Sequence, residues 1–331
     1  MTTKPTPQNI LLDKSGRLLK EGVFTAPFVY DRSMIKHNRI SICERDCFYI
    51  ANRRFGLYIS VCDKSITGYI SIILADFENM TVMSRTLTKF LPFGKMKMPQ
   101  SPNEGKISFS NEKCGALIVS NGKEKYIKCD FIDFYDSKNL YINLTISTDN
   151  LVDVYSTADF GENRFEYNCF GAGMLARGIV RMGGAEYTAE CEKTYVFHNF
   201  ERGNNKLLSH DAYLFANHYL KDRMPFSLKL KDSENNSVLN NCAVYNGSIN
   251  RLGKIRTSHN EKTPKSSYIF NEIGHALDIT FTPLDNNKDY IMRATAYDRM
   301  VIFGRIEGDM ILNKNISVGF NRLPSLMEVI F

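Results

Sequence analysis

The hydrophobic residues of this chain recur at every second position in short runs, and turn-forming residues close each run. Between residues 47 and 78 the runs are CFYIANRR, FGLYISVCD and ITGYISIILADFE, and between residues 106 and 148 they are KISFSN, CGALIVSN, KYIKCDFIDF and LYINLTIST. β-Branched and aromatic residues with period two are typical of antiparallel strands. No stretch up to residue 150 holds a helical stripe, so the first half is predicted to be a β domain.

Two glycine turns mark predicted hairpins. Asn121-Gly122 suits a type I′ turn, which needs positive φ at both central positions. Beyond a turn at GAG (171–173), Gly183-Gly184 separates one strand from a second extended run that ends in HNFERG. The runs DAYLFANHYL, FSLKLKD and DYIMRATAYDRMVIFGRIEGDMIL then continue the strand pattern. Only residues 324–329 are expected to form a short helix or a frayed end.

The chain is predicted to be all-β with two domains in tandem. A length of 331 residues is ample for two cores. The acidic and small residues STADFGEN predict a boundary between residues 155 and 165. We therefore expect a loose arm over residues 1–20, a first β domain over 21–155 and a second over 165–331. Pro5 and Pro7 oppose regular structure in the arm.

Composition excludes several classes of function. Hydrophobic residues make up 43% of the chain and charged residues 24%, which is typical of a folded protein. The net charge of +6 is the difference between 42 cations and 36 anions spread along the chain, so no basic stripe predicts nucleic-acid binding. No export-type apolar segment opens the chain, and no run reaches the ~18 apolar residues of a membrane span. A cytoplasmic protein without a transmembrane segment is expected.

Neither a metal nor a cofactor is predicted. The eight cysteines include Cys43 and Cys47 at a CxxxC spacing, but no second pair follows at a zinc-like distance. Cys169 and Cys191 flank the Gly183-Gly184 hairpin without a motif for nucleophilic catalysis. GAGMLARG lacks the third glycine and the βαβ context of a dinucleotide site. Reduced and mostly buried thiols are expected instead.

Several ordered segments resemble the bacterial domain of unknown function 2804 family. In the first half these are RISICERDCFYI, GYISIILADFE and FLPFGKMKMPQSPNEGKISF. The second half adds GIVRMGGAEYTAECEKTYVFHNFERG, VIFGRIEGDMIL and ISVGFNR. The resemblance covers about Leu11 to Phe320 and implies two lipocalin-like antiparallel β-barrels or sandwiches in tandem, distantly akin to carotenoid hydratase-type proteins. Periodicity by itself predicts only an all-β meander.

This chain departs from the family pattern at one motif. Members read like Asp-Trp-Gly-Arg-Gly where this chain has Asn199, Phe200, Glu201, Arg202 and Gly203. The arginine and the last glycine match, but the acid is an amide and the indole is a phenyl ring. An aspartate that would serve as a general acid or base is therefore absent, and the chain is a divergent member.

The motif and its neighbours supply the candidate ligand-binding residues, which are His198, Phe200, Glu201, Arg202, Asn217 and Tyr245. The Arg202 guanidinium suits a carboxylate held in a fork, or else an internal salt bridge that pins a loop. His198 suits a proton carrier, or else a cap on a hydrogen-bond network. Tyr245 suits the wall of an apolar cavity, or else it is an ordinary residue of the hydrophobic core.

Three functions remain open at this point. The first is binding of a small, largely apolar molecule in a barrel mouth or in the cleft between the domains. The second is a cofactor-independent hydratase, lyase or isomerase acting on a lipid- or isoprenoid-like substrate, which the carotenoid-hydratase likeness implies. The third is a structural or interaction protein whose barrels are filled by side chains. The sequence assigns no oligomeric state.

Overall fold

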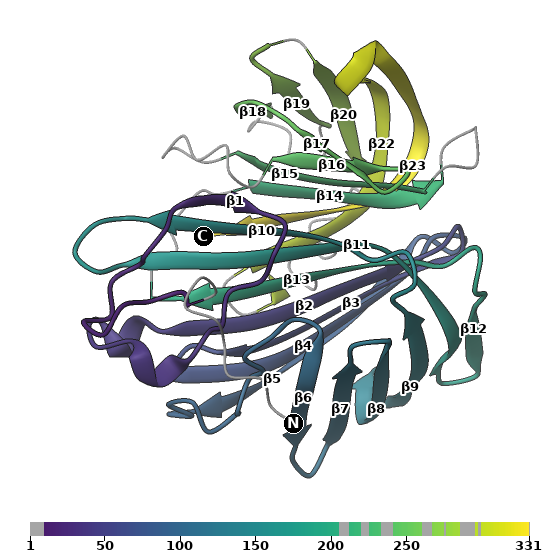
Figure 1. Ribbon diagram of the computed structural model, residues 1–331. Coiled ribbons are helices and arrows are strands. Elements are labelled where there is room, and N and C mark those ends of the chain that lie inside the picture. Colours follow the sequence, from purple (N-terminus) through teal and green to yellow (C-terminus); the bar gives the residue numbers. More distant parts are fainter. Residues whose placement is uncertain are drawn as a thin grey trace.

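The structure is a computed structural model that describes residues 10–204, 212–219, 225–232, 241–259, 267–274, 276–284, 295–296 and 299–330. Two curled antiparallel sheets lie one above the other, each a half-barrel (Figure 1). The predicted all-β fold of two tandem lipocalin-like domains is confirmed. No helix in these ranges is long and apolar enough to cross a membrane.

The first sheet holds thirteen strands in the order β5-β4-β3-β2-β13-β11-β9-β8-β7-β6, with β1, β10 and β12 beside this path. The bounds are β1 (Gly22–Phe24), β2 (Cys43–Ala51), β3 (Phe55–Asp63), β4 (Thr67–Asp76), β5 (Thr81–Phe90), β6 (Glu104–Ser110), β7 (Cys114–Asn121), β8 (Glu124–Tyr135), β9 (Lys138–Ser147), β10 (Val152–Asp159), β11 (Phe165–Met182), β12 (Ala185–Ala189) and β13 (Tyr195–Gly203). Two short 3-10 helices, η2 (Arg32–Met34) and η3 (Arg39–Ser41), precede β2.

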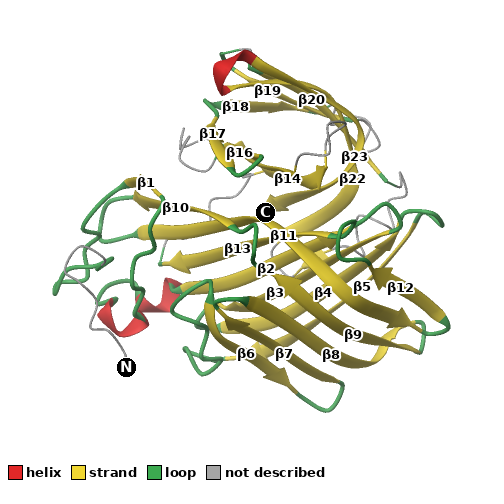
Figure 2. Cartoon of the chain, turned by 45° about the vertical axis from the view of Figure 1, so that its right-hand side comes forward, coloured by secondary structure: helices red, strands yellow, loops and turns green. Residues whose placement is uncertain are grey.

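Within the described residues, the second sheet holds ten strands in the order β17-β16-β15-β14-β23-β22-β20-β19-β18, with β21 paired to β22. The bounds are β14 (Ala212–Tyr219), β15 (Pro225–Asp232), β16 (Cys242–Tyr245), β17 (Ser248–Arg251), β18 (Ile255–Ser258), β19 (Tyr268–Glu272), β20 (Leu277–Pro283), β21 (Thr295–Ala296), β22 (Arg299–Leu312) and β23 (Ile316–Ile330), with a 3-10 turn η5 (Asn313–Asn315) before β23. Figure 2 shows how this smaller sheet curls over the first.

The long strand β11 joins the two parts of the first sheet. Its first half pairs with β10 and β13, and its second half pairs with β9 and β12. The change occurs at a bulge between Gly171 and Met174, where Gly173 has a φ of 81° and a Cβ would lie 2.3 Å from the Asn150 carbonyl oxygen. The expected glycine turn is therefore a bulge within one strand. The predicted Gly183-Gly184 hairpin is confirmed, since Met182 pairs with Ala185.

The two sheets divide the chain differently from the expected domains. Strands β11 and β13 belong to the first sheet, so this sheet extends to Gly203, and residues 155–165, where a domain boundary was expected, lie along its strands β10 and β11. Asp159 pairs with Phe165, and the residues between these two form the β10–β11 hairpin turn. Polar and small residues mark tight turns as well as linkers, which explains the difference.

Two segments near the chain ends, residues 10–20 and 324–329, differ from what the sequence indicates, whereas residues 1–9 of the expected arm lie outside the described residues. Within the expected arm, Leu11 and Leu12 are buried against Tyr167 and Phe200 of the first sheet. Residues 324–329, expected as a short helix, lie in β23, which pairs with both β14 and β22. Hydrogen bonds to a neighbour on each side outweigh a weak local helical preference.

Successive side chains along the strands of the first sheet pack into two separate cores. On β2, Cys47 and Tyr49 join the cluster that packs between the two sheets, whereas Phe48 joins the cluster inside the first half-barrel. This alternation follows from the pleat, which points successive side chains to opposite faces. Tyr49 also lies 6.0 Å from Phe303 of the second sheet, measured between ring centroids. The two domains therefore share one apolar core.

We predict that Phe303→Ala will destabilise both domains together. Phe303 is fully buried and lies against Tyr49, Phe77 and Gly56, where any Cβ would approach its ring to 2.7 Å. Truncating a buried phenylalanine costs about 3–5 kcal/mol of the free energy of unfolding. Urea unfolding should show this loss, while Ile311→Ala on the same strand, where the side chain is 49% exposed, should stay within about 0.5 kcal/mol of the parent. A comparable, small effect of both changes would contradict the shared core.

Candidate functional site

The candidate motif lies on β13, directly beside β2 at the centre of the first sheet. Glu201 is paired with Arg45 and Arg202 with Glu44 in the antiparallel register. Because side chains alternate along a strand, the motif is split between two faces of the sheet. Asn199 and Glu201 face the second sheet, and the other candidates of β13 face away from it.

Five charged side chains form a buried cluster between the sheets, which we call the seam cluster; they are Arg45, Glu201, Lys229, Arg299 and Glu328. Arg45 donates to Glu201 at 2.6 and 2.9 Å and to Glu328 at 3.1 and 3.2 Å. Arg299 donates to Glu328 at 2.9 Å and to Glu201 at 3.4 Å. Each carboxylate is thus shared by guanidinium groups from both sheets, which is the strong geometry for buried ion pairs.

The arginines keep Glu201 ionised. Burial opposes the charge of this carboxylate, but Arg45 and Arg299 outweigh burial and hold the pKa of Glu201 well below its ordinary value. A group with so low a pKa carries no proton near neutral pH. Glu201 therefore suits an electrostatic or positioning role and does not suit a general acid.

Lys229 completes the seam cluster from β15. Its ammonium donates to the Asn199 side-chain oxygen at 2.7 Å, and Asn199 in turn donates to Glu201 at 2.6 Å. The nitrogen also lies 5.7 Å from the centroid of the Phe170 ring. Burial lowers the pKa of Lys229, although Glu201 opposes the shift. Fully ionised, the cluster holds three cations and two anions.

His198, Phe200 and Arg202 lie on the opposite face, where Phe200 packs with Leu11, Leu12 and Tyr30 of the N-terminal segment. Arg202 donates to Asp46 at 2.6 Å, and the same carboxylate contacts Nε2 of His198 at 2.7 Å. The guanidinium carbon lies 3.6 Å from the centroid of the Phe200 ring. Phe48 stacks on His198 at 4.2 Å between centroids. Burial lowers the pKa of His198, partly offset by its bond to Asp46.

The segment from Pro99 to Asn103 closes this second cluster. Arg202 donates to the Pro99 carbonyl at 2.9 Å, and Lys125 donates to the Pro102 carbonyl at 2.6 Å. Arg202 also donates to the Arg45 carbonyl at 2.8 Å. The Arg202 guanidinium is thus engaged by Asp46 and by backbone carbonyls, and His198 is hydrogen-bonded to the same aspartate.

Asn217 and Tyr245 lie in the second sheet and are not part of either cluster. Asn217 accepts a hydrogen bond from Ser227 at 2.8 Å, and its buried Nδ2 atom has no partner within the described part of the chain. Tyr245 packs on the core between the sheets opposite Phe226 in the register. The six predicted site residues therefore occupy three places in the fold.

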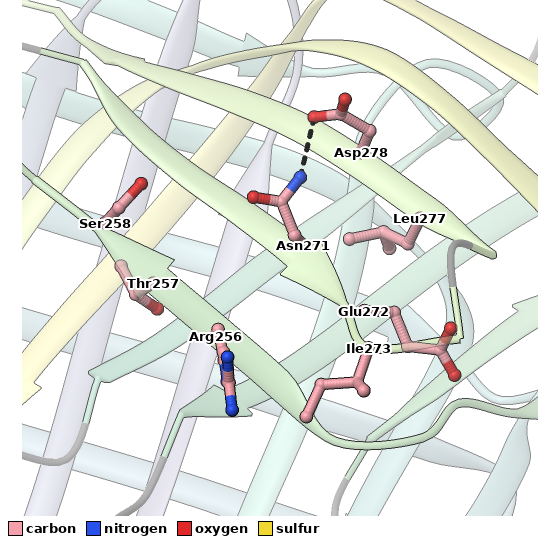
Figure 3. A pocket seen from close by; sticks show the side chains of 8 residues that line it. All are labelled: Arg256, Thr257, Ser258, Asn271, Glu272, Ile273, Leu277 and Asp278. Carbon is pink, nitrogen blue, oxygen red and sulfur yellow. Dashed lines mark hydrogen bonds between the residues drawn. The ribbon is translucent and has the colours of Figure 1, made fainter.

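Two hollows accompany these clusters. A rim cavity of about 30 Å³ lies at the edge of the seam and is lined by Cys43, Phe165, Glu166, Glu201, Arg202, Gly203 and Tyr213. A larger open recess of about 730 Å³ lies over β18, β19 and β20 and is lined by Arg256, Thr257, Ser258, Asn271, Glu272, Ile273, Leu277 and Asp278 (Figure 3).

The polar groups of the large recess already serve the local structure. Asn271 donates to Asp278 at 3.0 Å, the bond drawn in Figure 3. Glu272 accepts from the backbone of Gly253 at 2.8 Å and of Ala276 at 3.0 Å. Arg256 and Asp278 are exposed to solvent. The rim cavity, beside the seam cluster, is therefore the better candidate site.

Sequence reasoning missed four of the five seam residues, namely Arg45, Lys229, Arg299 and Glu328. Lys229 and Glu328 are charged residues in the apolar strand runs FSLKLKD and LPSLMEVI, whereas Arg45 lies between two acidic residues in CERDC. A charged residue at a position that the alternation predicts to face the core was the signal for a buried charge that the sequence offered. It could not identify partners, because Arg45 and Glu328 are 283 residues apart.

We predict that Glu201→Gln will destabilise the protein at neutral pH and flatten its response to acid. Removing one member of a buried ion pair costs about 3–5 kcal/mol. The pKa of Glu201 is lower in the folded state than its ordinary 4.5, so its contribution is complete above 4.5 and is lost as the pH falls below that value. Urea unfolding from neutral pH to a pH of about 3 should give a shallower decline in the variant. Exposed Glu307→Gln serves as the control, and parallel curves for parent and Glu201→Gln would refute the assignment.

Several solved structures share this fold, among them the two that follow. Kievitone hydratase from Nectria haematococca has a TM-score of 0.54 at 13% sequence identity, over 97% of this chain and 98% of that chain. A protein assigned as AttH from Nitrosomonas europaea has a TM-score of 0.54 at 12% identity, over 94% of this chain and 99% of that chain. At such low identity the likeness concerns the fold. A search of curated proteins finds no match for the sequence.

The family resemblance of the sequence is confirmed over the full chain. The sequence profile of the domain of unknown function DUF2804 matches residues 2–331. This range includes both sheets and the motif from Asn199 to Gly203 that contributes to the seam cluster. The chain belongs to the DUF2804 family.

Proposed function

We propose that this protein binds a small, largely apolar molecule between its two sheets, with the polar end of the ligand beside Lys229. The observation that carries the proposal is the burial of this lysine together with the neutral partner of its ammonium group. Its side chain is 2% exposed, and its ammonium donates to the neutral amide of Asn199. A buried charge is costly unless an opposite charge or several hydrogen bonds compensate it. A ligand carboxylate would supply that compensation.

The charge balance of the seam cluster favours an acidic ligand. Arg45 and Arg299 share the carboxylates of Glu201 and Glu328, which leaves the charge of Lys229 as the surplus. Binding of a carboxylate would neutralise this surplus and raise the lowered pKa of Lys229 towards its ordinary value. The preferred ligand class is therefore a small amphiphilic acid.

Aromatic side chains around Lys229 suit the apolar part of such a ligand. Phe197 and Phe215 stack at 4.6 Å between centroids, and Phe170 lies 5.7 Å from Phe197. Tyr213 lies parallel to Phe215 and also lines the rim cavity. Ligand sites commonly combine apolar walls with a few placed polar groups.

Entry would take place at the rim cavity. Its volume of about 30 Å³ accommodates roughly two water molecules, so a ligand must part the sheets at this edge. Phe165 and Gly203 form the first-sheet side of the rim, and Tyr213 forms the second-sheet side. Opening at Tyr213 would lead from the rim towards Phe215 and the seam.

A second candidate function is hydration of a double bond at the same place. Kievitone hydratase, which shares the fold, gives this alternative its chemistry. Hydration needs a proton donor and an activated water. The ionised state of Glu201 disfavours it as the donor, whereas burial lowers the pKa of Lys229, the direction that makes its ammonium a better proton donor. Turnover, seen as gain of water by mass spectrometry, would distinguish this function from binding.

We predict that 11-(dansylamino)undecanoic acid, a fluorescent amphiphilic acid, binds the parent protein and that Lys229→Met weakens binding about 10- to 100-fold. Methionine retains the length of the side chain and removes its charge, so the fold should survive or gain stability. Lys128→Met, at an exposed position of β8, is the matched control. The methyl ester of the same probe should bind the parent and Lys229→Met alike.

Two results would contradict the proposal. Equal affinity of the parent and Lys229→Met for the acid would remove Lys229 from the site. Failure of the parent to bind either the acid or its ester would favour the third alternative, an interaction protein whose sheets are filled by side chains. In that case the side chains of the continuous core would fill the space between the sheets and leave no room for a ligand.

A further inference from the structure

An apolar patch lies at one end of the first sheet, where the β3–β4 turn, the end of β5 and the η3 helix meet. We call this patch the apolar tip. Its members are large hydrophobic side chains turned into solvent, with exposures of 65% for Ile40, 49% for Ile66, 80% for Phe90, 55% for Leu91 and 51% for Phe93. Contiguous exposed apolar residues of this size usually mark an interaction surface.

Backbone hydrogen bonds join these segments into one surface. The Leu91 amide donates to the Ile66 carbonyl at 2.7 Å, and the Phe93 amide donates to the Ser65 carbonyl at 3.0 Å. The Ser65 hydroxyl donates to the Arg39 carbonyl at 3.0 Å, which brings the residue preceding Ile40 beside the turn. Figure 1 shows the helical segments, in purple, at this end of the strands.

The chain holds the apolar tip in place at a conformational cost. Leu91 and Phe93 have φ values of 50° and 46°, in the left-handed region that bulky L residues rarely adopt. Between and after them, Pro92, Met96 and Met98 are buried and anchor the segment. The fold thus fixes a strained loop with its apolar side chains outward.

Basic residues surround the apolar tip. Arg39, Lys89, Lys95 and Lys97 are exposed, and Lys64 is half-buried in the turn. Residues 79–103 contain no aspartate or glutamate. Two neighbouring carboxylates point inward: Asp63 is fully buried and accepts from the Gly94 amide, and Glu44 is buried against Arg32. The end of the sheet is therefore positively charged.

We propose that the apolar tip docks this protein on the surface of an anionic lipid membrane. Exposed aromatic and aliphatic side chains enter the boundary between head groups and acyl chains, while the surrounding cations attract anionic head groups. Both features occur here on one fixed surface, and the charge selects an anionic bilayer over a neutral one. The proposal is independent of ligand binding at the seam.

The absence of tryptophan from the chain provides a clean test. Phe90→Trp places a single tryptophan on the apolar tip, and Ile132→Trp places one at a matched site that is 55% exposed on β8. Vesicles of phosphatidylcholine with phosphatidylglycerol should shift the emission of Phe90→Trp to shorter wavelength. Vesicles of phosphatidylcholine alone should have little effect, and Ile132→Trp should respond to neither. Both variants should retain the urea midpoint of the parent.

Charge removal supplies the second arm of the test. Lys95→Gln with Lys97→Gln, in the Phe90→Trp background, should weaken binding roughly 30-fold, since each cation near an anionic surface contributes about fivefold. Added salt should weaken binding in the same direction. No emission shift of Phe90→Trp with anionic vesicles would overturn the proposal. A shift that depends on protein concentration without vesicles would assign the apolar tip to a second copy of the chain and would overturn it as well.

Discussion

The structure depends on a set of charges sealed between two sheets. Arg45 and Arg299 each contact both Glu201 and Glu328, so neither sheet can move away without leaving charged groups unpaired in an apolar core. Buried ion pairs contribute little net stability compared with apolar packing, but the loss of a single member is expensive. The seam cluster therefore fixes how the sheets are oriented, while Phe303 and its neighbours supply the apolar burial.

The same constraint shapes what the protein can do. A carboxylate held ionised by two arginines is a poor proton donor, and Arg202 is occupied by Asp46 and backbone carbonyls. Lys229, bonded to the side-chain amide of Asn199, is the seam group with a surplus charge.

Local pattern predicted the strands well, because alternation and turn residues act over a few positions. The Gly183-Gly184 hairpin and the two-domain β fold followed from it and from the family resemblance. The division of the motif between two faces follows from the pleat, yet nothing local identified which face met the second sheet. Arg45 and Glu328 meet across 283 residues, and residues 324–329 became a strand through pairing with β14 and β22. Such long-range pairing has no signature in a short window of sequence.

A double-mutant cycle between Arg45 and Glu328 tests the central claim most directly. The free energies of unfolding of the parent, Arg45→Met, Glu328→Met and the double variant give the coupling between the two residues. We expect each single variant to lose several kcal/mol and the double variant to lose much less than the sum, with a coupling above about 1.5 kcal/mol. Additive losses, with a coupling indistinguishable from zero, would contradict a seam locked by this pair of charges.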